Sequence, residues 1–205
     1  MYKLHVEYYM LYDILSTFRK KAYYDSAVCV IFDKTHTLEF SHVGPASPDA
    51  LYDMASVSKI ITTTLLLQLM DEGRLHVTDL CLPLLPFLAG PATLRRLGSV
   101  TVGQLMTHTS GILPWYPLYA DGRPFPVIFE MLMETTPEEN GYAYSDLNYM
   151  LLGMIYTNLT GMSLREGVEN TIAGQFGIPI GYGPVKPAQC APCCLGNQIE
   201  KRMCA

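Results

Sequence analysis

The sequence predicts a helix-rich α+β fold, in which a helix and a β-hairpin precede a helical domain. Two observations lead to this prediction. Residues 26–32 and 37–43 are short runs rich in β-branched and apolar residues, and a polar turn joins them as in a hairpin. Several later segments instead repeat apolar residues at helical spacing. No further strand run follows residue 177, so we expect the sheet to be incomplete.

Three parts are expected along the chain. Residues 1–55 are predicted to hold an amphipathic helix over 5–22, followed by the hairpin. Residues 56–177 are predicted to form a long helix that starts near Ser56 and an all-helical domain. Residues 178–205 are expected to be an irregular, cysteine-rich tail, in which a short helix over 197–203 is one option.

The central stretch of the chain is a long apolar run, 60–70, which contains no charged residue. Such a run predicts a helix that is buried on most sides, and Gly73 is expected to end it. Residues 74–100 are interpreted as loop with short turns.

Further helices are predicted where capping residues precede apolar repeats. Thr101 is expected to cap a helix through 102–108, and Ser163 to open a capping box with Glu166 and a helix to about residue 173. A further helix is expected over 126–134, and another from the Ser145-Asp146 start.

Composition excludes several classes of protein. Hydrophobic residues make up 49% of the 205 residues and charged residues 16%, which indicates an ordered, core-rich chain. The net charge is −5 and the basic residues are scattered, so no nucleic-acid partner is expected. The apolar run 60–70 is too short to span a membrane. Glu7 and Asp13 interrupt the apolar start, which therefore lacks the features of a signal peptide and predicts a cytoplasmic location.

The six cysteines include three in the segment QCAPCCLGNQ: Cys190, Cys193 and Cys194. A single Cys-x-x-Cys is a weak zinc or redox signal, because metal sites usually pair two such motifs or add histidines. No histidine follows His108. Free thiols are therefore expected, with no metal and no cofactor, and a metal or redox role of the tail is a distant alternative.

The chemically informative stretch is YDMASVSK, which contains a Ser-x-x-Lys pair, Ser56 and Lys59. Residues three apart lie on one face of a helix, so a helix that starts near Ser56 brings the hydroxyl and the amine together at its N-terminal end. A serine needs a base to become a nucleophile, and a partly buried lysine of lowered pKa can serve as that base. Taken alone, the pair is more typical of a helix-capping serine beside a solvated lysine.

Two other candidates also have structural interpretations. Tyr144, in GYAYSDLNYMLL, is on its own more typical of a buried aromatic residue whose hydroxyl has a partner. His108 and Ser110 could suggest a Ser-His pair, but residues so close in sequence seldom place the base productively on the hydroxyl.

Four stretches taken together resemble one family in order and spacing. They are LYDMASVSK, EGRLHVTDLCLPLLPFL, GQLMTHTSGI and YAYSDLNYMLLG. Over about residues 26–177 the chain resembles the serine β-lactamase-like superfamily, and within it the branch of class C β-lactamases, DD-peptidases and related esterases. The resemblance implies an α/β domain and a helical domain with the active site between them.

Carried over to this sequence, the resemblance implies a role for each residue of the motifs. Ser56 would be the acylated nucleophile, with its backbone amide as half of the oxyanion hole, and Lys59 would accept its proton. Tyr144 would relay a proton to the leaving group. Asp146 would contact substrate, at a place where the family usually has asparagine. Its carboxylate could accept a hydrogen bond from Lys59, but it cannot donate an amide hydrogen to a substrate carbonyl, which leaves an ester substrate open. A class A Ser-Asp-Asn register fails because Leu147 stands where asparagine should be.

The sequence also departs from the family after residue 177, where nothing matches the expected Lys-Thr-Gly or His-x-Gly motif. The chain is then the front part of a longer enzyme, a module whose sheet a second copy completes, or a non-catalytic remnant. The main hypothesis is a serine hydrolase that acts on a small ester, amide or lactam through a Ser56 acyl-enzyme. The alternative is a catalytically silent module that acts in binding or oligomerisation.

Overall fold

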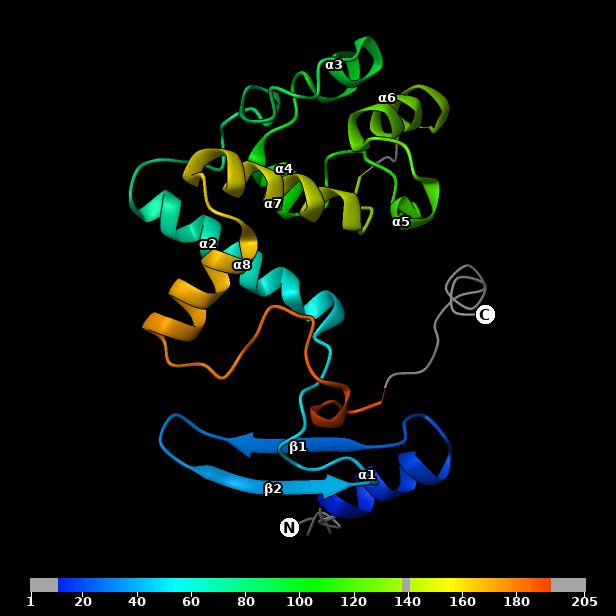
Figure 1. Ribbon diagram of the computed structural model, residues 1–205, viewed down its shortest axis with the longest axis vertical. Helices are drawn as coiled ribbons and strands as arrows, with labels where there is room; N and C mark the ends of the chain where they lie inside the picture. Colours follow the sequence, from blue (N-terminus) through cyan, green and yellow to red (C-terminus); the bar gives the residue numbers. More distant parts are fainter. Residues whose placement is uncertain (1–10, 138–140, 193–205) are drawn as a thin grey trace, which may run out of the picture. The chain divides into compact units, whose positions relative to one another are not determined.

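The computed structural model describes residues 11–137 and 141–192. These residues group into two compact units. The hairpin unit contains the described residues up to Met54 together with those from Pro184 onward, and the helical unit contains the described residues between Ala55 and Gly183 (Figure 1). Each unit has its own secondary structure, and they are described separately below.

The hairpin unit consists of helix α1 (Leu11–Lys20) and strands β1 (Ala27–Phe32) and β2 (Thr37–Val43). The strands pair antiparallel from Ala27↔Val43 to Phe32↔Thr37, with an irregularity in the register before Phe32. Helix α1 packs against β2. The predicted hairpin is thus confirmed. The predicted first helix is present from Leu11, and its residues 5–10 lie outside the described residues.

A late segment of the chain also belongs to the hairpin unit. A 3₁₀ turn, Pro187–Gln189, precedes Cys190, which forms a parallel bridge with Leu51. The Leu51 amide donates to the Gln189 carbonyl at 2.8 Å, and the Ala191 amide donates to the Leu51 carbonyl at 2.9 Å. Residues 189–191 of the predicted tail thus make backbone pairing with the segment after the hairpin. Residues 193–205, which include the short helix considered over 197–203, lie outside the described residues.

The helical unit begins with a 3₁₀ turn and contains seven α-helices and a π-helical segment within the described residues. In chain order these are the turn Ala55–Val57, α2 (Ser58–Asp71), α3 (Pro91–Leu97), α4 (Val102–Met106), α5 (Leu118–Asp121), α6 (Phe125–Thr135), α7 (Asp146–Thr160), α8 (Leu164–Gly167) and the π-helical Val168–Gln175. A short 3₁₀ turn, Leu82–Leu84, lies between α2 and α3.

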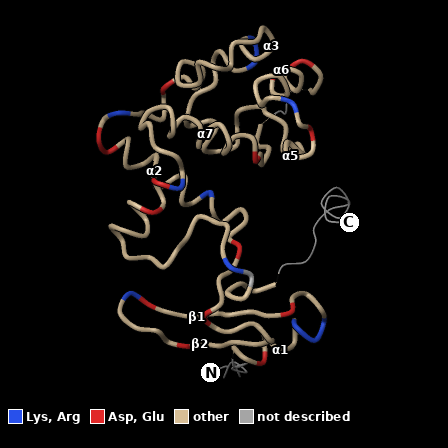
Figure 2. Tube along the Cα trace, viewed as in Figure 1, with Lys and Arg blue, Asp and Glu red and all other residues tan. Residues whose placement is uncertain are grey.

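Helix α7 is central to the core of this unit. It packs against α2, α4 and α8, and it buries Leu147, Leu151, Leu152 and Ile155. Its buried face joins a continuous apolar cluster with residues such as Leu66 of α2 and Phe129 of α6. Asp146 is the sole charged residue of α7, at its first position (Figure 2). The apolar faces of these helices fix the positions of α2 and α7, whose N-terminal ends carry the predicted site residues.

Several local signals placed the helix ends correctly. Thr101 caps α4 and Ser163 caps α8, each in a capping box with the residue three positions on. Gly73 follows the end of α2 with a φ of +70°, a conformation that glycine adopts without steric cost. The helix predicted over 126–134 is α6, one residue longer at each end.

Three predictions about the helical unit need correction. Helix α2 begins at Ser58, so Ser56 lies in the preceding 3₁₀ turn and not in the α-helix itself. The run 60–70 is buried less completely than predicted, because one face of the helix, with Ile60 at 64% exposure and Leu67, is open while its other residues are buried or half-buried. The segment 74–100, interpreted as loop, contains α3, whose first amides are bound by Glu130 of α6.

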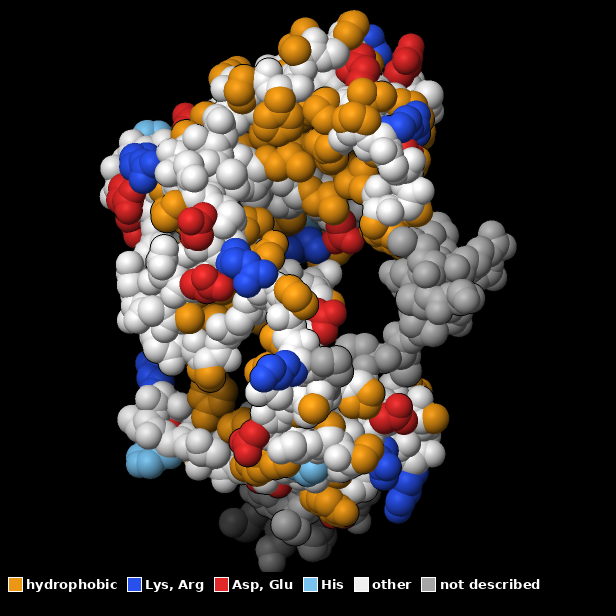
Figure 3. All heavy atoms as spheres, in the orientation of Figure 1, with side chains coloured by type: hydrophobic (Ala, Val, Ile, Leu, Met, Phe, Trp, Pro, Cys, Tyr) orange, Lys and Arg blue, Asp and Glu red, His pale blue; other side chains and the backbone are white. Residues whose placement is uncertain are grey.

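The distribution of charged residues in the structure agrees with their scatter along the sequence. Lysine, arginine and acidic residues are scattered along both units rather than gathered in one patch (Figure 2). Hydrophobic side chains are conspicuous on the part of the helical unit that contains α3 and α6 (Figure 3). In the described part of the chain, no helix has the length and apolar character needed to cross a membrane.

Candidate active site

Ser56 lies on a tight turn immediately before α2. Ala55 has a φ of +42°, a left-handed conformation that is strained for a residue with a Cβ. The Ser58 hydroxyl donates to the Ala55 carbonyl at 2.5 Å, within the turn. Ser56 is exposed, and Lys59, in the first turn of α2, points its amine back to it, so that Lys59 Nζ lies 3.2 Å from Ser56 Oγ. The Ser-x-x-Lys spacing thus places the two groups in hydrogen-bonding distance.

Asp146 reaches the same place from the start of α7, 87 residues along the chain. Lys59 Nζ and Asp146 Oδ1 are 2.5 Å apart, and the side chain of Lys59 is 14% exposed while that of Asp146 is 41% exposed. The loop between α4 and α5 fixes this end of α7: the Asp146 amide donates to the Pro114 carbonyl, and the buried Ser145 hydroxyl donates to the Leu113 carbonyl, both at 2.8 Å. Asp146 is thereby held against the amine.

Tyr144 completes a cluster with Ser56, Lys59 and Asp146, which we call the Ser56 group. The Ser56 side chain first, and the Lys59 ammonium next, hold the pKa of the Tyr144 phenol below the ordinary value. The Lys59 ammonium also lies 4.8 Å from the centre of the Tyr144 ring. Tyr144 is 45% exposed, so the interpretation as a buried aromatic does not apply.

The protonation of Lys59 differs from the expectation of a lowered pKa. Burial does lower the pKa of this amine, but hydrogen bonds to Asp146 and Tyr144 and the negative charge of Asp146 act against it. The result is a Lys59 pKa above its ordinary value. Lys59 is therefore a cation at neutral pH, because a carboxylate that the local motif does not contain lies against it.

His108 and Tyr149 also lie at this site, and the sequence interpretation assigned neither to it. The His108 ring is stacked 4.4 Å from the Tyr144 ring and 5.3 Å from the Tyr149 ring, centre to centre. His108 does not pair with Ser110, whose hydroxyl donates to Asn148 Oδ1 at 2.7 Å. The signal that could have found His108 is its place directly after a capped helix, in a segment shared with the family resemblance.

Comparison with known proteins relates this arrangement to one family. The model of the family described as "Beta-lactamase" matches residues 13–191, which is most of the chain. The chain belongs to the Beta-lactamase family. It is 33% identical over 147 residues to an Escherichia coli K12 protein provisionally named a D-alanyl-D-alanine carboxypeptidase. It is 29% identical over 137 residues to penicillin-binding protein 4 of Amycolatopsis lactamdurans.

Two solved structures share the fold of this chain. A class C β-lactamase from Rhodobacter sphaeroides is 25% identical with a TM-score of 0.67, over 80% of this chain and 48% of that one. A D-stereospecific amidohydrolase from Streptomyces is 27% identical with a TM-score of 0.62, over 75% of this chain and 50% of that one. The chain spans about a third of the length of the curated relatives, 34% and 35%, and the matches cover 65% and 63% of it.

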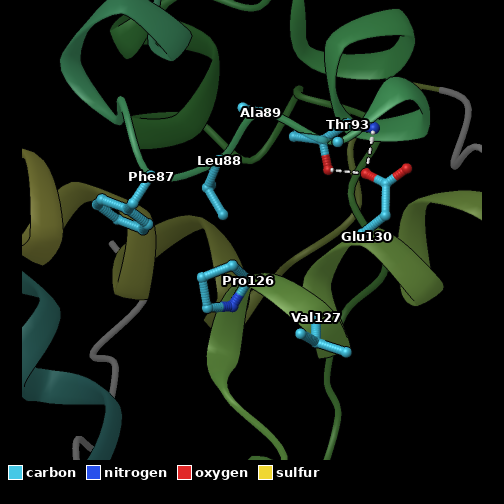
Figure 4. Close-up of a pocket in the computed structure, with 8 residues that line it drawn as sticks. Phe87, Leu88, Ala89, Thr93, Pro126, Val127 and Glu130 are labelled. Atoms are coloured by element: carbon cyan, nitrogen blue, oxygen red, sulfur yellow. Dashed lines mark hydrogen bonds between the residues drawn. The ribbon is translucent and has the colours of Figure 1, made fainter.

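A separate hollow of about 380 Å³ lies between α3 and α6 (Figure 4). Phe87, Leu88, Pro126 and Val127 line it, and Glu130 borders it while accepting hydrogen bonds from Thr93. None of its lining residues belongs to the Ser56 group. Among the described residues, no three His, Cys, Asp or Glu side chains are grouped to hold a metal ion. The described cysteines, Cys29, Cys81 and Cys190, are free thiols.

Proposed function

We propose that the chain carries the acylation machinery of a serine hydrolase, in which Ser56 attacks an ester, amide or lactam carbonyl. The observation that supports this proposal is the convergence of four side chains from two helix starts. Lys59 Nζ lies 3.2 Å from Ser56 Oγ, 2.5 Å from Asp146 Oδ1 and 4.8 Å from the centre of the Tyr144 ring, and Ser56 and Lys59 hold the pKa of Tyr144 below its ordinary value. Such a nucleophile, with a proton acceptor in hydrogen-bonding distance, is what acyl transfer requires.

The pKa directions favour Tyr144 over Lys59 as the proton acceptor. The raised pKa keeps Lys59 protonated, whereas the lowered pKa of Tyr144 makes its phenolate more accessible. In the proposed step the Tyr144 oxygen takes the proton of Ser56 as Oγ bonds to the carbonyl carbon. The tetrahedral oxyanion collapses to the acyl-enzyme, and Tyr144 returns the proton to the leaving group. Tyr144 then takes a proton from a water that attacks the acyl-enzyme, and it returns that proton to Ser56 Oγ as the Oγ–acyl bond breaks and the acid is released.

The other groups have supporting roles in this proposal. The Lys59 ammonium donates to Ser56 Oγ and stabilises both the phenolate and the developing alkoxide. The Ser56 backbone amide would be one oxyanion donor. Asp146 neutralises Lys59 and offers only acceptor oxygens to a substrate. A neutral ester is therefore a better substrate in this proposal than a peptide or lactam whose recognition needs an amide donor at this position.

Turnover of a chromogenic short-chain ester and of a chromogenic cephalosporin by the purified chain tests the proposal. Ser56→Ala is expected to abolish hydrolysis, because the nucleophile is removed. Ser58→Ala is the matched control, because the Ser58 hydroxyl donates to the Ala55 carbonyl and is not one of the Ser56 group. Hydrolysis that survives in Ser56→Ala would contradict the proposal. Completion of the sheet by a second copy stays a prediction, which the molecular mass in solution tests.

A further inference from the structure

We propose that His108 is a positioning residue that fixes the segment 143–146, and thereby places Tyr144 and Asp146 against Ser56 and Lys59. The inference rests on the proposed function for the role of Tyr144, but the geometry on which it depends is independent of any activity. His108 touches none of the reacting groups by hydrogen bond. It acts through the backbone on either side of Tyr144 and through the Tyr144 ring.

Two hydrogen bonds connect His108 to this segment. The Ala143 amide donates to the His108 carbonyl at 3.0 Å, and the Ser145 amide donates to His108 Nδ1 at 3.1 Å. The residues on both sides of Tyr144 are therefore bound to a single residue that follows α4. A chain bound at positions before and after a residue leaves little freedom for the backbone of the residue between them.

The histidine ring fixes the side chain of Tyr144 as well. The two ring centres are 4.4 Å apart with 36° between the planes, and His108 is only 8% exposed. Tyr142 and Tyr149 lie on the same ring at 6.0 Å and 5.3 Å. His108 has a φ of +59°, a strained conformation for a residue other than glycine. Strain of this kind persists where the surrounding contacts over-determine it, which here are the contacts with 142–149.

The bond from the Ser145 amide depends on the protonation of the imidazole. Nδ1 accepts a hydrogen only when it carries none itself, so the ring must be neutral, with its proton on Nε2. The charged and titratable groups that face the ring are Lys59 on α2, Asp146 and Tyr149 on α7, and Tyr142 and Tyr144 before α7. Burial and the charge of Lys59 hold the pKa of His108 below its ordinary value of 6.5, and Asp146 acts in the opposite direction.

The sign of the pH effect follows from this lowered pKa. The neutral ring is the native form above pH 6.5, where the positioning contact is complete. As the pH falls through 6.5 the unfolded chain takes up a proton first, so the native state loses stability relative to it. Below the lowered pKa of the native His108, Nδ1 becomes protonated and the Ser145 amide loses its acceptor. The rate of acylation of Ser56 should therefore fall as the pH decreases through the pKa of native His108.

The test compares His108→Asn with His108→Ala in the 205-residue chain. Asparagine tolerates a positive φ and places an acceptor oxygen close to the position of Nδ1, but it does not titrate. Alanine provides no acceptor and is strained at this φ. With a fluorophosphonate probe at pH 8, we expect His108→Asn to react within about tenfold of wild type, the effect of one weakened neutral hydrogen bond. We expect His108→Ala to lose about 100-fold, because Tyr144 is misplaced.

The pH profile separates positioning from a merely structural role. As the pH is lowered, wild type should lose reactivity at a higher pH than His108→Asn, because the profile of the variant lacks the titration of histidine. Coinciding acid limbs of the two proteins, or a folded His108→Ala that reacts as fast as wild type, would overturn the proposal.

Nuclear magnetic resonance decides the point without any reaction. In the wild-type chain, the Ser145 amide proton shift should follow the titration of the His108 ring nitrogens, and Nδ1 should be the unprotonated nitrogen at pH 8. In His108→Asn the Ser145 shift should lose this dependence. A Ser145 amide that ignores the titration in wild type overturns the inference. If the probe does not label wild-type Ser56 at all, the proposed function fails, and this spectroscopic result still stands or falls on its own.

Discussion

The pKa of Lys59, a residue of the local Ser-x-x-Lys motif, depends on a contact with Asp146, which lies 87 residues further along the chain. The Ser-x-x-Lys spacing brings the amine to within 3.2 Å of Ser56 Oγ, and partial burial alone would lower its pKa. Asp146, at 2.5 Å, and Tyr144 together reverse that direction. In the proposed mechanism Lys59 is therefore a cation, and Tyr144, whose pKa is lowered, accepts the serine proton. This proposed division of roles depends on the charge at position 146.

Replacement of Asp146 by asparagine tests this division. The amide oxygen can still accept a hydrogen bond from Lys59, but the attraction of the negative charge is lost, so burial should dominate and the pKa of Lys59 should fall. In the proposed mechanism Lys59 acts as a cation. As the pH is raised, Asp146→Asn should therefore lose its reactivity toward a fluorophosphonate at a lower pH than wild type does.

The pKa of Lys59 can be followed through its side-chain carbon shifts. Asp121→Asn is the matched control, because Asp121 forms its ion pair with Arg123, at 2.5 Å, and not with Lys59. It should leave the titration of Lys59 unchanged. A Lys59 pKa that stays the same or rises in Asp146→Asn would show that Asp146 does not set it.

The motif residues could be found in the sequence, whereas their protonation could not. Ser56, Lys59 and Tyr144 stand in stretches that resemble a family, and the structure brings them together. The raised pKa of Lys59 depends on how closely Asp146 approaches, which no spacing within the motif encodes. His108 was considered only as a partner of Ser110, because its contacts with 143–145 arise from the packing of α4 against α7.

At the scale of elements, the site depends on how α7 and α8 pack with α2. Gly167, at the end of α8, lies where a Cβ would be 2.6 Å from the Tyr156 hydroxyl oxygen and 3.0 Å from Leu65 Cδ1. Tyr156 belongs to α7 and Leu65 to α2, and both are buried. The absence of a side chain at Gly167 therefore allows α8 to approach both helices at once.

We expect Gly167→Ala to destabilise the helical unit. Overpacking of a core position typically costs about 1–3 kcal/mol, and the better helix propensity of alanine offsets up to about 1 kcal/mol of that. Urea unfolding followed by circular dichroism measures the change in the free energy of unfolding. Gly181→Ala is the control, because nothing lies within 4 Å of its added Cβ, and it should change that free energy by less than about 0.5 kcal/mol. A Gly167→Ala chain as stable as the control would contradict this packing account.

Elements with local signals were predicted well, and elements that depend on distant partners were not. The hairpin and the caps at Thr101 and Ser163 follow from residues within a few positions of each other. Helix α3 was missed because its stabilising cap comes from another helix: Glu130 accepts hydrogen bonds from the amides of Ala92 and Thr93, at 2.7 and 3.0 Å. Helix α2 begins at Ser58, two residues after the predicted start near Ser56. The left-handed conformation of Ala55 in the preceding turn could not be predicted from the sequence.

At the scale of the whole molecule, the helical unit contains the complete Ser56 group. Ser56, Lys59, Tyr144 and Asp146 all lie between Ala55 and Gly183, as does His108. The hairpin unit contributes a two-stranded sheet within the described residues, on which Phe32 and Leu38 are exposed. The chain matches the Beta-lactamase family over 13–191 and about a third of the length of its curated relatives. The residues that we propose as the nucleophile and its activating groups thus belong to the part of the family fold that this chain contains.

The most direct test of this account is the intact mass of the chain after incubation with a fluorophosphonate probe. Attack by Ser56 Oγ forms an oxygen–phosphorus bond and releases fluoride, so no later hydrolytic step is needed for the readout. We predict a single adduct on wild type, located on Ser56 by peptide mapping, which disappears in Ser56→Ala and persists in Ser58→Ala. A folded wild-type chain that stays unmodified, or an adduct that remains in Ser56→Ala, would contradict the claim that these residues form an activated nucleophile.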